Sequence, residues 1–451
     1  MSAQATSLKD RVLRAGGWAL SGFAVAQLIR LGGNLILTRL LFPEAFGLMA
    51  VVYVLMTGLA MFSDLGISQA IIQSRRGHEP DFLNTAWSVQ ILRGVIVWLL
   101  ALAFAFLLPL AVSLDWVAAG TVYANPSLPW IWGVFSLTAL IQGFDSTKLA
   151  LAQRNLQIKA ITQIEVGAQI VALVVMVVWA ELYHSIWALV AGAITAVLVR
   201  CVAGHVWLPG ATNRFHWDKE SSRELLHFGK WVFFLSIMGF LAASSDRIIL
   251  AGFLTPTQMG LYSVAFLLSN AFAELFTSML SRIAFPAICE VVRDRPASVA
   301  RMYHRLQMIA DICLFAVAGI LFVAGEVMVQ LLYDQRYHEA GPMLELLALG
   351  LIAGRYAVVY QFCLALGQMR YMFVSNAVRL IALFAGIPLG FSLAGLEGAL
   401  IAIVASQFVA WPVAVYFKIK HGLMDWGREL LGLPVFCLVA AAGWGVMQVL
   451  R

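Results

Sequence analysis

Residues 34–55 read NLILTRLLFPEAFGLMAVVYVL, and residues 247–268 read RIILAGFLTPTQMGLYSVAFLL. The two stretches align without a gap, and each contains proline followed four residues later by glycine, at Pro43 and Gly47 and at Pro256 and Gly260. Proline is favoured at the first position of a helix, where its missing N–H costs nothing. The chain is therefore predicted to be duplicated, with each copy joining the first two helices of one half. The identical pairs are Ile36/Ile249, Leu37/Leu250, Leu41/Leu254, Pro43/Pro256, Gly47/Gly260, Leu48/Leu261, Val51/Val264 and Leu55/Leu268.

Composition places these helices in a membrane. Apolar residues make up 61% of the chain and charged residues only 12%, whereas a soluble domain has about 25% charged residues. Transmembrane β-strands are about 10 residues long and alternate in polarity. The run Val95–Leu108 is instead continuously apolar, which excludes a β-barrel. The fold class expected is an all-α integral membrane protein.

Apolar stretches of about 20 residues, the length that crosses a bilayer as a helix, give about 13 transmembrane helices, within a range of 12–14. The predicted spans are 15–38, 45–68, 82–108, 128–146, 160–181, 185–207, 228–253, 260–284, 305–333, 340–367, 370–394, 395–419 and 428–450.

Basic residues predict the orientation of these spans. Most of the 30 lysines and arginines lie in the N-terminal segment and in every second loop after it. Cytoplasmic loops carry such an excess, so the N-terminus is expected in the cytoplasm. The net charge of +6 is then a topology signal and does not indicate nucleic-acid binding. The alternate loops and the C-terminus contain only Arg39, Arg336 and Arg451.

The duplication predicts two pseudo-symmetric six-helix bundles around a central cavity, related as parallel repeats by an axis along the membrane normal. The expected divisions are an N-terminal lobe at 1–208, a cytoplasmic amphipathic linker at 209–227, a C-terminal lobe at 228–420 and an additional transmembrane helix within 421–451. The linker is the most polar stretch between spans, and we expect it to form an amphipathic helix.

The sequence offers no catalytic machinery. It lacks a P-loop and an HExxH motif, and its cysteines have no CxxC spacing. No loop is long enough to hold a soluble domain. We therefore expect no enzyme activity, no cofactor and no metal site. Two repeated helical bundles without an ATP-hydrolysing motif are typical of a secondary transporter that works by alternating access.

Four arginines inside the predicted spans are candidates for substrate binding: Arg30, Arg247, Arg355 and Arg379. A charge at the bilayer centre costs about 2.5–3.5 kcal/mol, so such side chains should face a cavity or a partner. In the repeat, Arg247 aligns with Asn34. Arg30 lies four residues before Asn34, on the same helix face. Arginine suits the oxygens of phosphate groups. The alternative is that each pairs with a local carboxylate or reaches an interface.

That alternative is favoured for Arg93 and Arg200. Among the acidic residues, Glu274 lies in the middle of a span and is the leading candidate for proton or cation coupling, with Asp246 as a second candidate. An ion pair with an arginine explains Glu274 equally well, and Asp246 adjoins Arg247.

The same stretches resemble a known family. Leu35–Leu55, the following FSDLGISQAIIQ at Phe62–Gln73, and Ser245–Ser269 are similar to the bacterial polysaccharide transporters of the multidrug/oligosaccharidyl-lipid/polysaccharide exporter superfamily. The resemblance implies two six-helix lobes in a V around a central cavity, in the bacterial inner membrane. Its members commonly have 12 or 14 spans, so a count of 13 departs from the pattern.

The resemblance also implies a function. It implies a flippase that moves undecaprenyl-pyrophosphate-linked oligosaccharide from the cytoplasmic to the outer leaflet, driven by an ion gradient, for exopolysaccharide, O-antigen or capsule. Polysaccharide polymerase machinery would be a partner. Arginines in the cavity would hold the pyrophosphate, and Arg30, Arg247, Arg355 and Arg379 are the counterparts by depth.

Two other functions remain to be weighed. A drug/cation antiporter of the same superfamily is the main alternative, although cationic substrates would favour buried carboxylates over arginines. A membrane enzyme such as a polymerase is the third, and the short outer loops disfavour it.

Overall fold

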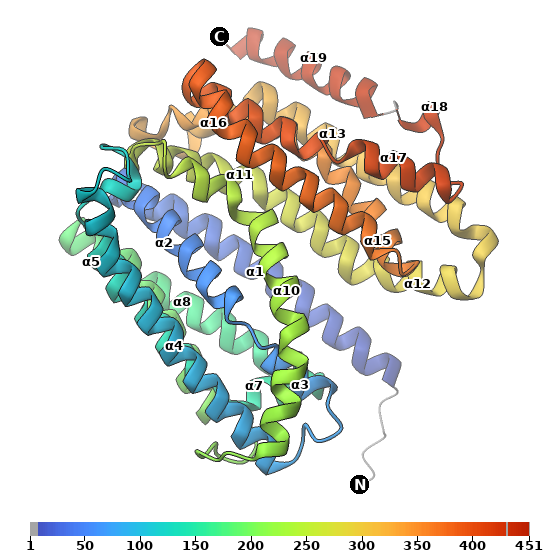
Figure 1. Ribbon diagram of the computed structural model, residues 1–451. Helices are drawn as coiled ribbons and strands as arrows, with labels where there is room; N and C mark the ends of the chain where they lie inside the picture. The colour runs from blue at the N-terminus through green and yellow to red at the C-terminus, as the bar shows by residue number, and fades with distance from the viewer. Residues whose placement is uncertain (1–7, 430–431, 451) are drawn as a thin grey trace. The chain divides into compact units, whose positions relative to one another are not determined.

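The structure is a computed structural model that describes residues 8–429 and 432–450 (Figure 1). Every regular element in this part of the chain is a helix, which confirms the predicted all-α class. The chain forms two compact units, Met1–Phe240 and Leu241–Arg451. Their boundary falls inside one long helix, so the linker and the first part of the predicted span 228–253 belong to the N-terminal unit.

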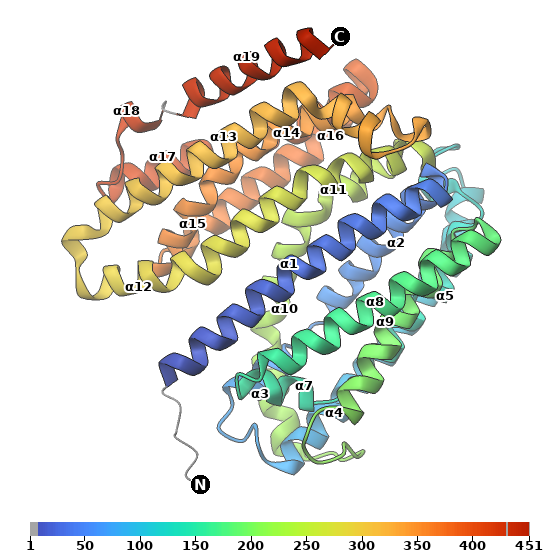
Figure 2. The ribbon, with the colours of Figure 1, turned by 180° about the vertical axis from the view of Figure 1, so that it is seen from behind.

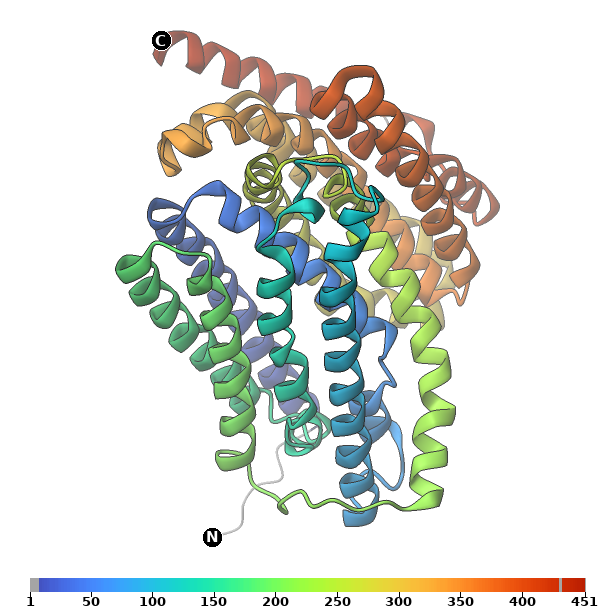
Figure 3. The ribbon, with the colours of Figure 1, turned by 60° about the vertical axis from the view of Figure 1, so that its left-hand side comes forward.

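Several helices of the N-terminal unit are short and are separated from the next helix by only a few residues. The helices of this unit are α1 (Leu8–Leu40), α2 (Pro43–Phe62), α3 (Ile67–Gln73), α4 (Pro80–Ser113), the 3-10 turn η1 (Val122–Ala124), α5 (Leu128–Phe135), α6 (Leu137–Gly143), α7 (Lys148–Arg154), α8 (Ile158–Tyr183), α9 (Trp187–Val206) and α10 (Lys219–Leu250), which continues into the C-terminal unit. Helix α8 packs between α1 and α9 (Figure 2), and α4 packs along α5 and α6 (Figure 3).

The C-terminal unit also consists of long helices and short helical segments. Its helices are α11 (Pro256–Met279), the π-helical turn η2 (Leu280–Ala284), α12 (Phe285–Asp294), η3 (Pro296–Ser298), α13 (Val299–Leu332), η4 (Gln335–Tyr337), α14 (Ala340–Gly350), η5 (Leu351–Arg355), α15 (Tyr356–Ala365), α16 (Met369–Phe408), α17 (Trp411–Lys420), α18 (Trp426–Glu429) and α19 (Gly432–Leu450).

The predicted spans correspond to helices throughout. In the described residues, 10 helices are long and apolar enough to cross a membrane. One of these, Met369–Lys420, contains two predicted spans. The predicted spans at 128–146 and 228–253 are not among the ten, but they are occupied by α5–α6 and by α10.

The division between the spans 370–394 and 395–419 is confirmed by a kink. The helix loses helical geometry at Ala394 and Gly395, and Gly395 has a φ of 57°, a region that favours glycine. After the kink the chain turns back on itself, and Gly390 and Gly398 lie in contact through their backbones. A side chain at either glycine would force the two arms apart.

The duplicated stretches form equivalent turns. Pro43 is the first residue of α2, and Pro256 is the first residue of α11, as the sequence predicts. Leu41 and Leu254, which match in the repeat, are both completely buried. The matched valines Val51 and Val264 are 1% exposed in each unit. These two identical pairs therefore pack inside their own units, whereas Ile36, also identical in the repeat, is 46% exposed.

The linker differs from the prediction. An amphipathic helix was expected over 209–227, but residues 209–218 are non-helical, and α10 begins at Lys219. Side chains of α4 bind the linker backbone: Asn84 accepts from the N–H of Arg214, and Thr85 accepts from the N–H of Asp218. Because these N–H groups already have side-chain partners, the segment is held in an extended conformation.

Helix α19, the additional C-terminal helix, packs lengthwise on α13 (Figure 2). Small residues permit the close approach. A side-chain carbon added at Gly319 would lie 3.3 Å from the backbone oxygen of Phe436, and one added at Gly432 would meet the ring of Phe315. The helix outside the repeat is thus part of the C-terminal unit.

Candidate functional site

The end of α10 carries two of the predicted site residues. The Nη2 of Arg247 donates to the backbone oxygen of Ala243 at 3.0 Å, and its Nε lies 3.8 Å from Oδ1 of Asp246. Its guanidinium also stacks over the ring of Phe266, 4.6 Å from the centroid. Asp246 is buried and accepts a hydrogen bond from the Tyr262 hydroxyl at 2.6 Å. Asp246 and Arg247 therefore pair with each other, and each also has a further partner.

Arg379 belongs to the same cluster. It lies on α16, and both it and Arg247 interact electrostatically with Tyr262. The Nε atoms of the two arginines are buried without a hydrogen-bond partner among the described residues. Asp246 contacts Tyr262 directly and pairs with Arg247, and the charge of Arg379 acts on the same hydroxyl. Two cations and one anion leave this cluster with a net positive charge, which suits an anionic ligand.

Arg355 lies in a different cluster, where carboxylates bind it. Its Nη2 is 2.9 Å from Oδ2 of Asp311 and 3.3 Å from Oε2 of Glu429. Its Nη1 donates to the backbone oxygen of Glu429 at 3.0 Å. Glu429 also accepts from Lys418, whose side chain is completely buried, at 2.5 Å. The cluster contains two cations and two anions and is balanced. A phosphate could reach Arg355 only by displacing these carboxylates.

Arg30 and Glu274 complete the predicted site residues. Arg30 is on α1 in the N-terminal unit, and interactions with other groups of the chain engage it. Glu274 is on α11 and accepts a hydrogen bond from the Asn270 side chain at 2.7 Å. Phosphate binding by Arg30 and ion coupling by Glu274 stay predictions.

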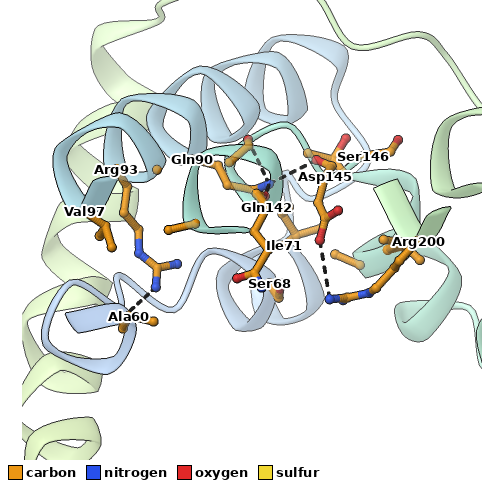
Figure 4. Close-up of a pocket in the computed structure, with 16 residues that line it drawn as sticks. Ala60, Ser68, Ile71, Gln90, Arg93, Val97, Gln142, Asp145, Ser146 and Arg200 are labelled. Carbon is orange, nitrogen blue, oxygen red and sulfur yellow. Dashed lines mark hydrogen bonds and ion pairs between the residues drawn. The ribbon is translucent and has the colours of Figure 1, made fainter. Parts of the chain in front are cut away.

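A polar cavity inside the N-terminal unit was not predicted. Its volume is about 170 Å³, and its lining includes Gln90, Arg93, Asp145 and Arg200 (Figure 4). A second cavity of about 270 Å³ shares Gln90 and Arg93 and extends to Asp64. The two cavities meet between the two helix interruptions, at 63–66 between α2 and α3 and at 144–147 between α6 and α7. Each interruption contributes one aspartate.

The aspartates pair loosely with arginines. Oδ2 of Asp145 is 3.5 Å from Nη1 of Arg200, and Oδ1 of Asp64 is 3.9 Å from Nη1 of Arg93. Arg93 and Arg200 were expected to pair with a carboxylate or to reach an interface, and the structure shows the carboxylate pairing for both. In the described part of the chain, Oδ1 of Asp145 and Nε of Arg200 are buried without hydrogen-bond partners.

Two side chains of α4 hold the ends of the interrupted helices. The amide of Gln90 lies within hydrogen-bonding distance of three carbonyl oxygens at the end of α6, those of Gln142, Gly143 and Asp145, at 3.0–3.2 Å. Arg93, one turn later, donates to the backbone oxygen of Ala60 at 2.6 Å, near the end of α2. Helix C-termini carry partial negative charge, so donors stabilise both interruptions.

The sequence does not predict this cavity, because the residues that line it are far apart along the chain. A local signal existed in the short polar breaks Ser63-Asp64 and Asp145-Ser146-Thr147 between apolar runs. Interrupted helices mark binding sites in many transporters. No group of three or more potential metal ligands occurs in the described residues.

The chain is similar to several known proteins. Residues 36–342 match the family described as polysaccharide biosynthesis protein. The chain is 22% identical to the lipopolysaccharide biosynthesis protein WzxC of Escherichia coli over 97% of its own length and 88% of that protein. It is 24% identical to the succinoglycan biosynthesis transport protein ExoT of Rhizobium meliloti, over 70% of this chain and 61% of that protein.

Solved structures share the fold. The lipid II flippase MurJ in an inward closed conformation superposes with a TM-score of 0.71, at 11% identity, over 96% of this chain and 100% of that chain. An inward-facing multidrug resistance MATE transporter gives a TM-score of 0.65, at 12% identity, over 89% and 94% of the two chains. This is a multi-pass membrane protein with the fold of the exporter superfamily. The match over most of its length means that the chain belongs to the polysaccharide biosynthesis protein family.

Proposed function

We propose that this protein is a flippase for a lipid-linked oligosaccharide. It moves an oligosaccharide carried on undecaprenyl pyrophosphate from the cytoplasmic to the outer leaflet of the bacterial inner membrane, for surface polysaccharide assembly. Support comes from the family, from relatives named for lipopolysaccharide biosynthesis and succinoglycan transport, and from the fold shared with a lipid II flippase. The cytoplasmic N-terminus follows from the distribution of basic residues. Polymerase machinery in the same membrane would take up the product.

The observation that carries the proposal is the cationic cluster of Arg247 and Arg379. A pyrophosphate brings several oxygens with negative charge, and each guanidinium can bind two of them. The Nε atoms of both arginines are buried without hydrogen-bond partners in the described residues, so the protein itself does not fully satisfy these guanidinium groups. Arg30 is proposed to contribute from the first half. Arg355 would join them only if Asp311 and Glu429 were displaced.

Transport is proposed to proceed by alternating access driven by an ion gradient, with Glu274 and Asp246 as the coupling groups expected from their depth. The second candidate function is drug/cation antiport, which the fold shared with a multidrug transporter favours. The two functions differ in the charge of the substrate. The net positive charge around Tyr262 supports the anionic one.

The deciding experiment uses a strain in which the gene is deleted. The leaflet in which lipid-linked oligosaccharide accumulates is measured, and surface polysaccharide is scored with it. Accumulation on the cytoplasmic leaflet with loss of surface polymer, both reversed by the wild-type gene, is the expected result. Normal surface polymer in a strain without a redundant transporter, together with increased drug sensitivity, would support the antiporter instead.

A further inference from the structure

The polar cavity of the N-terminal unit contains charged groups that substrate binding does not require. Asp145 lies in the interruption between α6 and α7 with its side chain 14% exposed, and one of its carboxylate oxygens has no hydrogen-bond donor among the residues that the structure describes. The adjoining cavity of about 170 Å³ is large enough for several waters. A buried carboxylate with an unsatisfied oxygen is costly, and taking up a proton removes that cost.

We propose that Asp145 binds and releases a proton during the transport cycle, with Arg200 as its counter-ion when the carboxylate is ionised. The inference rests on the proposed transport function and adds a coupling site in the N-terminal unit, distinct from Glu274 and Asp246. In the reaction, the carboxylate takes up one proton from bulk solvent and becomes a neutral carboxylic acid, and the same proton returns to bulk solvent when the carboxylate ionises again. Arg200 then loses its charge partner.

A proton fits this cavity better than a metal ion. Two guanidinium groups, those of Arg93 and Arg200, line the same space and repel a metal cation. The carbonyl oxygens at the end of α6 that could coordinate a metal converge on the amide of Gln90. These three backbone oxygens are therefore already engaged, and protonation of Asp145 requires no further ligand.

The charged and titratable groups around Asp145 come from several elements. Lys148 donates to the backbone oxygen of His205, and a ring nitrogen of His205 lies 2.8 Å from the backbone oxygen of Phe144. These two groups are thus occupied by backbone partners, which leaves Arg200 as the side chain that pairs with the carboxylate. The groups considered are Arg200 and His205 on α9, Lys148 on α7, Arg93 on α4, and Asp64 in the other interruption.

Hydrogen bonds from two side chains of α4 connect the backbone at Asp145 to the end of α2. Gln90 bonds the backbone oxygen of Asp145, and Arg93, three residues later on α4, bonds the backbone of α2 at Ala60. Residues three apart share a helix face. Protonation that shifts the 144–147 segment is transmitted through α4 to the interruption at Asp64. Gln90 and Arg93 act as positioning residues in this arrangement.

The test is a difference titration. Purified wild-type protein and the Asp145→Asn variant are titrated potentiometrically in detergent, and one curve is subtracted from the other. The expected result is the loss of one bound proton, with a midpoint clearly above the ordinary aspartate pKa of about 3.9. The control is Asp334→Asn in the loop before η4, since hydrogen bonds with Arg336 hold the pKa of the Asp334 carboxyl below its usual value. The difference curve for that control should show one proton lost with a midpoint below the ordinary aspartate pKa.

A second variant keeps the proposal testable if Asp145→Asn folds poorly. In Arg200→Gln the positive charge is gone, so the protonated carboxyl is favoured and the midpoint should move to higher pH. A midpoint at or below the ordinary aspartate value, or one that Arg200→Gln leaves unchanged, would overturn the proposal. Asp145→Asn should also lose surface polymer in cells. Normal polymer in the deletion strain would instead refute the flippase function itself, whatever the titration shows.

Discussion

Lys418, completely buried, lies with its ammonium 2.5 Å from a carboxylate oxygen of Glu429. The same carboxylate is 3.3 Å from Arg355, which Asp311 binds from the other side. The pair joins α17 to the short helix α18 that precedes α19. It therefore fixes the start of the C-terminal segment to the repeat.

Removing one partner of this pair should destabilise the protein. Glu429→Gln leaves the Lys418 ammonium buried without a counter-ion, a change that typically costs about 3–5 kcal/mol. We expect a lower midpoint of thermal unfolding for the purified variant in detergent. The double variant Lys418→Met with Glu429→Gln removes both charges and should recover part of the loss. If the two substitutions simply added, the charges would not be coupled.

Substitution of Arg247 and Arg379 should reduce transport. Each guanidinium is expected to give about 1.5–3 kcal/mol of hydrogen bonding to a charged ligand, equivalent to a loss of roughly tenfold or more in affinity per arginine. Arg247→Gln and Arg379→Gln should therefore reduce surface polysaccharide, measured at equal amounts of folded protein in the membrane. The double variant should export least.

Two other arginines serve as controls for this prediction. Arg293 is exposed on α12 and pairs with Asp294, so Arg293→Gln should change neither export nor stability. Arg355→Gln should lower the unfolding midpoint, because Asp311 and Glu429 lose their partner. Equal export by the Arg247, Arg379 and Arg293 variants would remove the cluster from the substrate site.

The close contact between α4 and α6 should be sensitive to size. A side-chain carbon added at Gly94 would lie 2.9 Å from the Cα of Gly143 and 3.0 Å from the backbone oxygen of Ala139. Gly94→Ala must push the helices apart, which costs about 1–3 kcal/mol and pulls Gln90 from the end of α6. We expect reduced export and a lower unfolding midpoint.

Gly133 provides the matched control. It is also a helical glycine of the N-terminal unit, but an added carbon there meets only a methyl carbon of Leu102 at 3.8 Å. Gly133→Ala should behave as the wild type. A Gly94→Ala variant as stable and active as Gly133→Ala would show that the helices tolerate separation.

The start of α10 should depend on pH through Asp218. Its carboxylate accepts hydrogen bonds from the Ser221 hydroxyl and N–H, which hold its pKa below the usual value. A group with a lowered folded-state pKa stabilises the protein above its unfolded pKa, about 3.9 for aspartate, and this contribution is lost as pH falls through the folded-state value. Acidification should therefore loosen the first turn of α10.

Hydrogen exchange at residues 219–225 measures this loosening. Exchange should accelerate at low pH, after correction for its intrinsic pH dependence, and Asp218→Ala should show the faster exchange already at neutral pH. The N-cap position explains the effect, since the carboxylate binds the third N–H of the helix. Unchanged exchange in Asp218→Ala would contradict the assigned role.

The sequence predicts the helices well because their signals are local. Apolar length gives the spans, Pro43 and Pro256 give the helix starts, and the glycine at 395 allows the kink. Identical positions such as Leu41 and Leu254 are buried in both units. These features depend on neighbours within a few turns.

The site is less predictable because its contacts are distant along the chain. Arg355 pairs with a carboxylate 44 residues before it and another 74 residues after it, and no periodicity relates them. The linker is extended because side chains of α4 bind its N–H groups, although its own polarity indicated an amphipathic helix. Asp145 and Arg200 are likewise joined only by folding.

The position of Glu429 also has a consequence for biosynthesis. As the protein is made, Lys418 leaves the ribosome before its counter-ion, and the ion pair can close only when the segment at 429 has been inserted. A nascent chain cut between these residues would carry an uncompensated ammonium in a site built to exclude water. The segment at 429 must therefore be in place before this part of the C-terminal unit reaches its full stability.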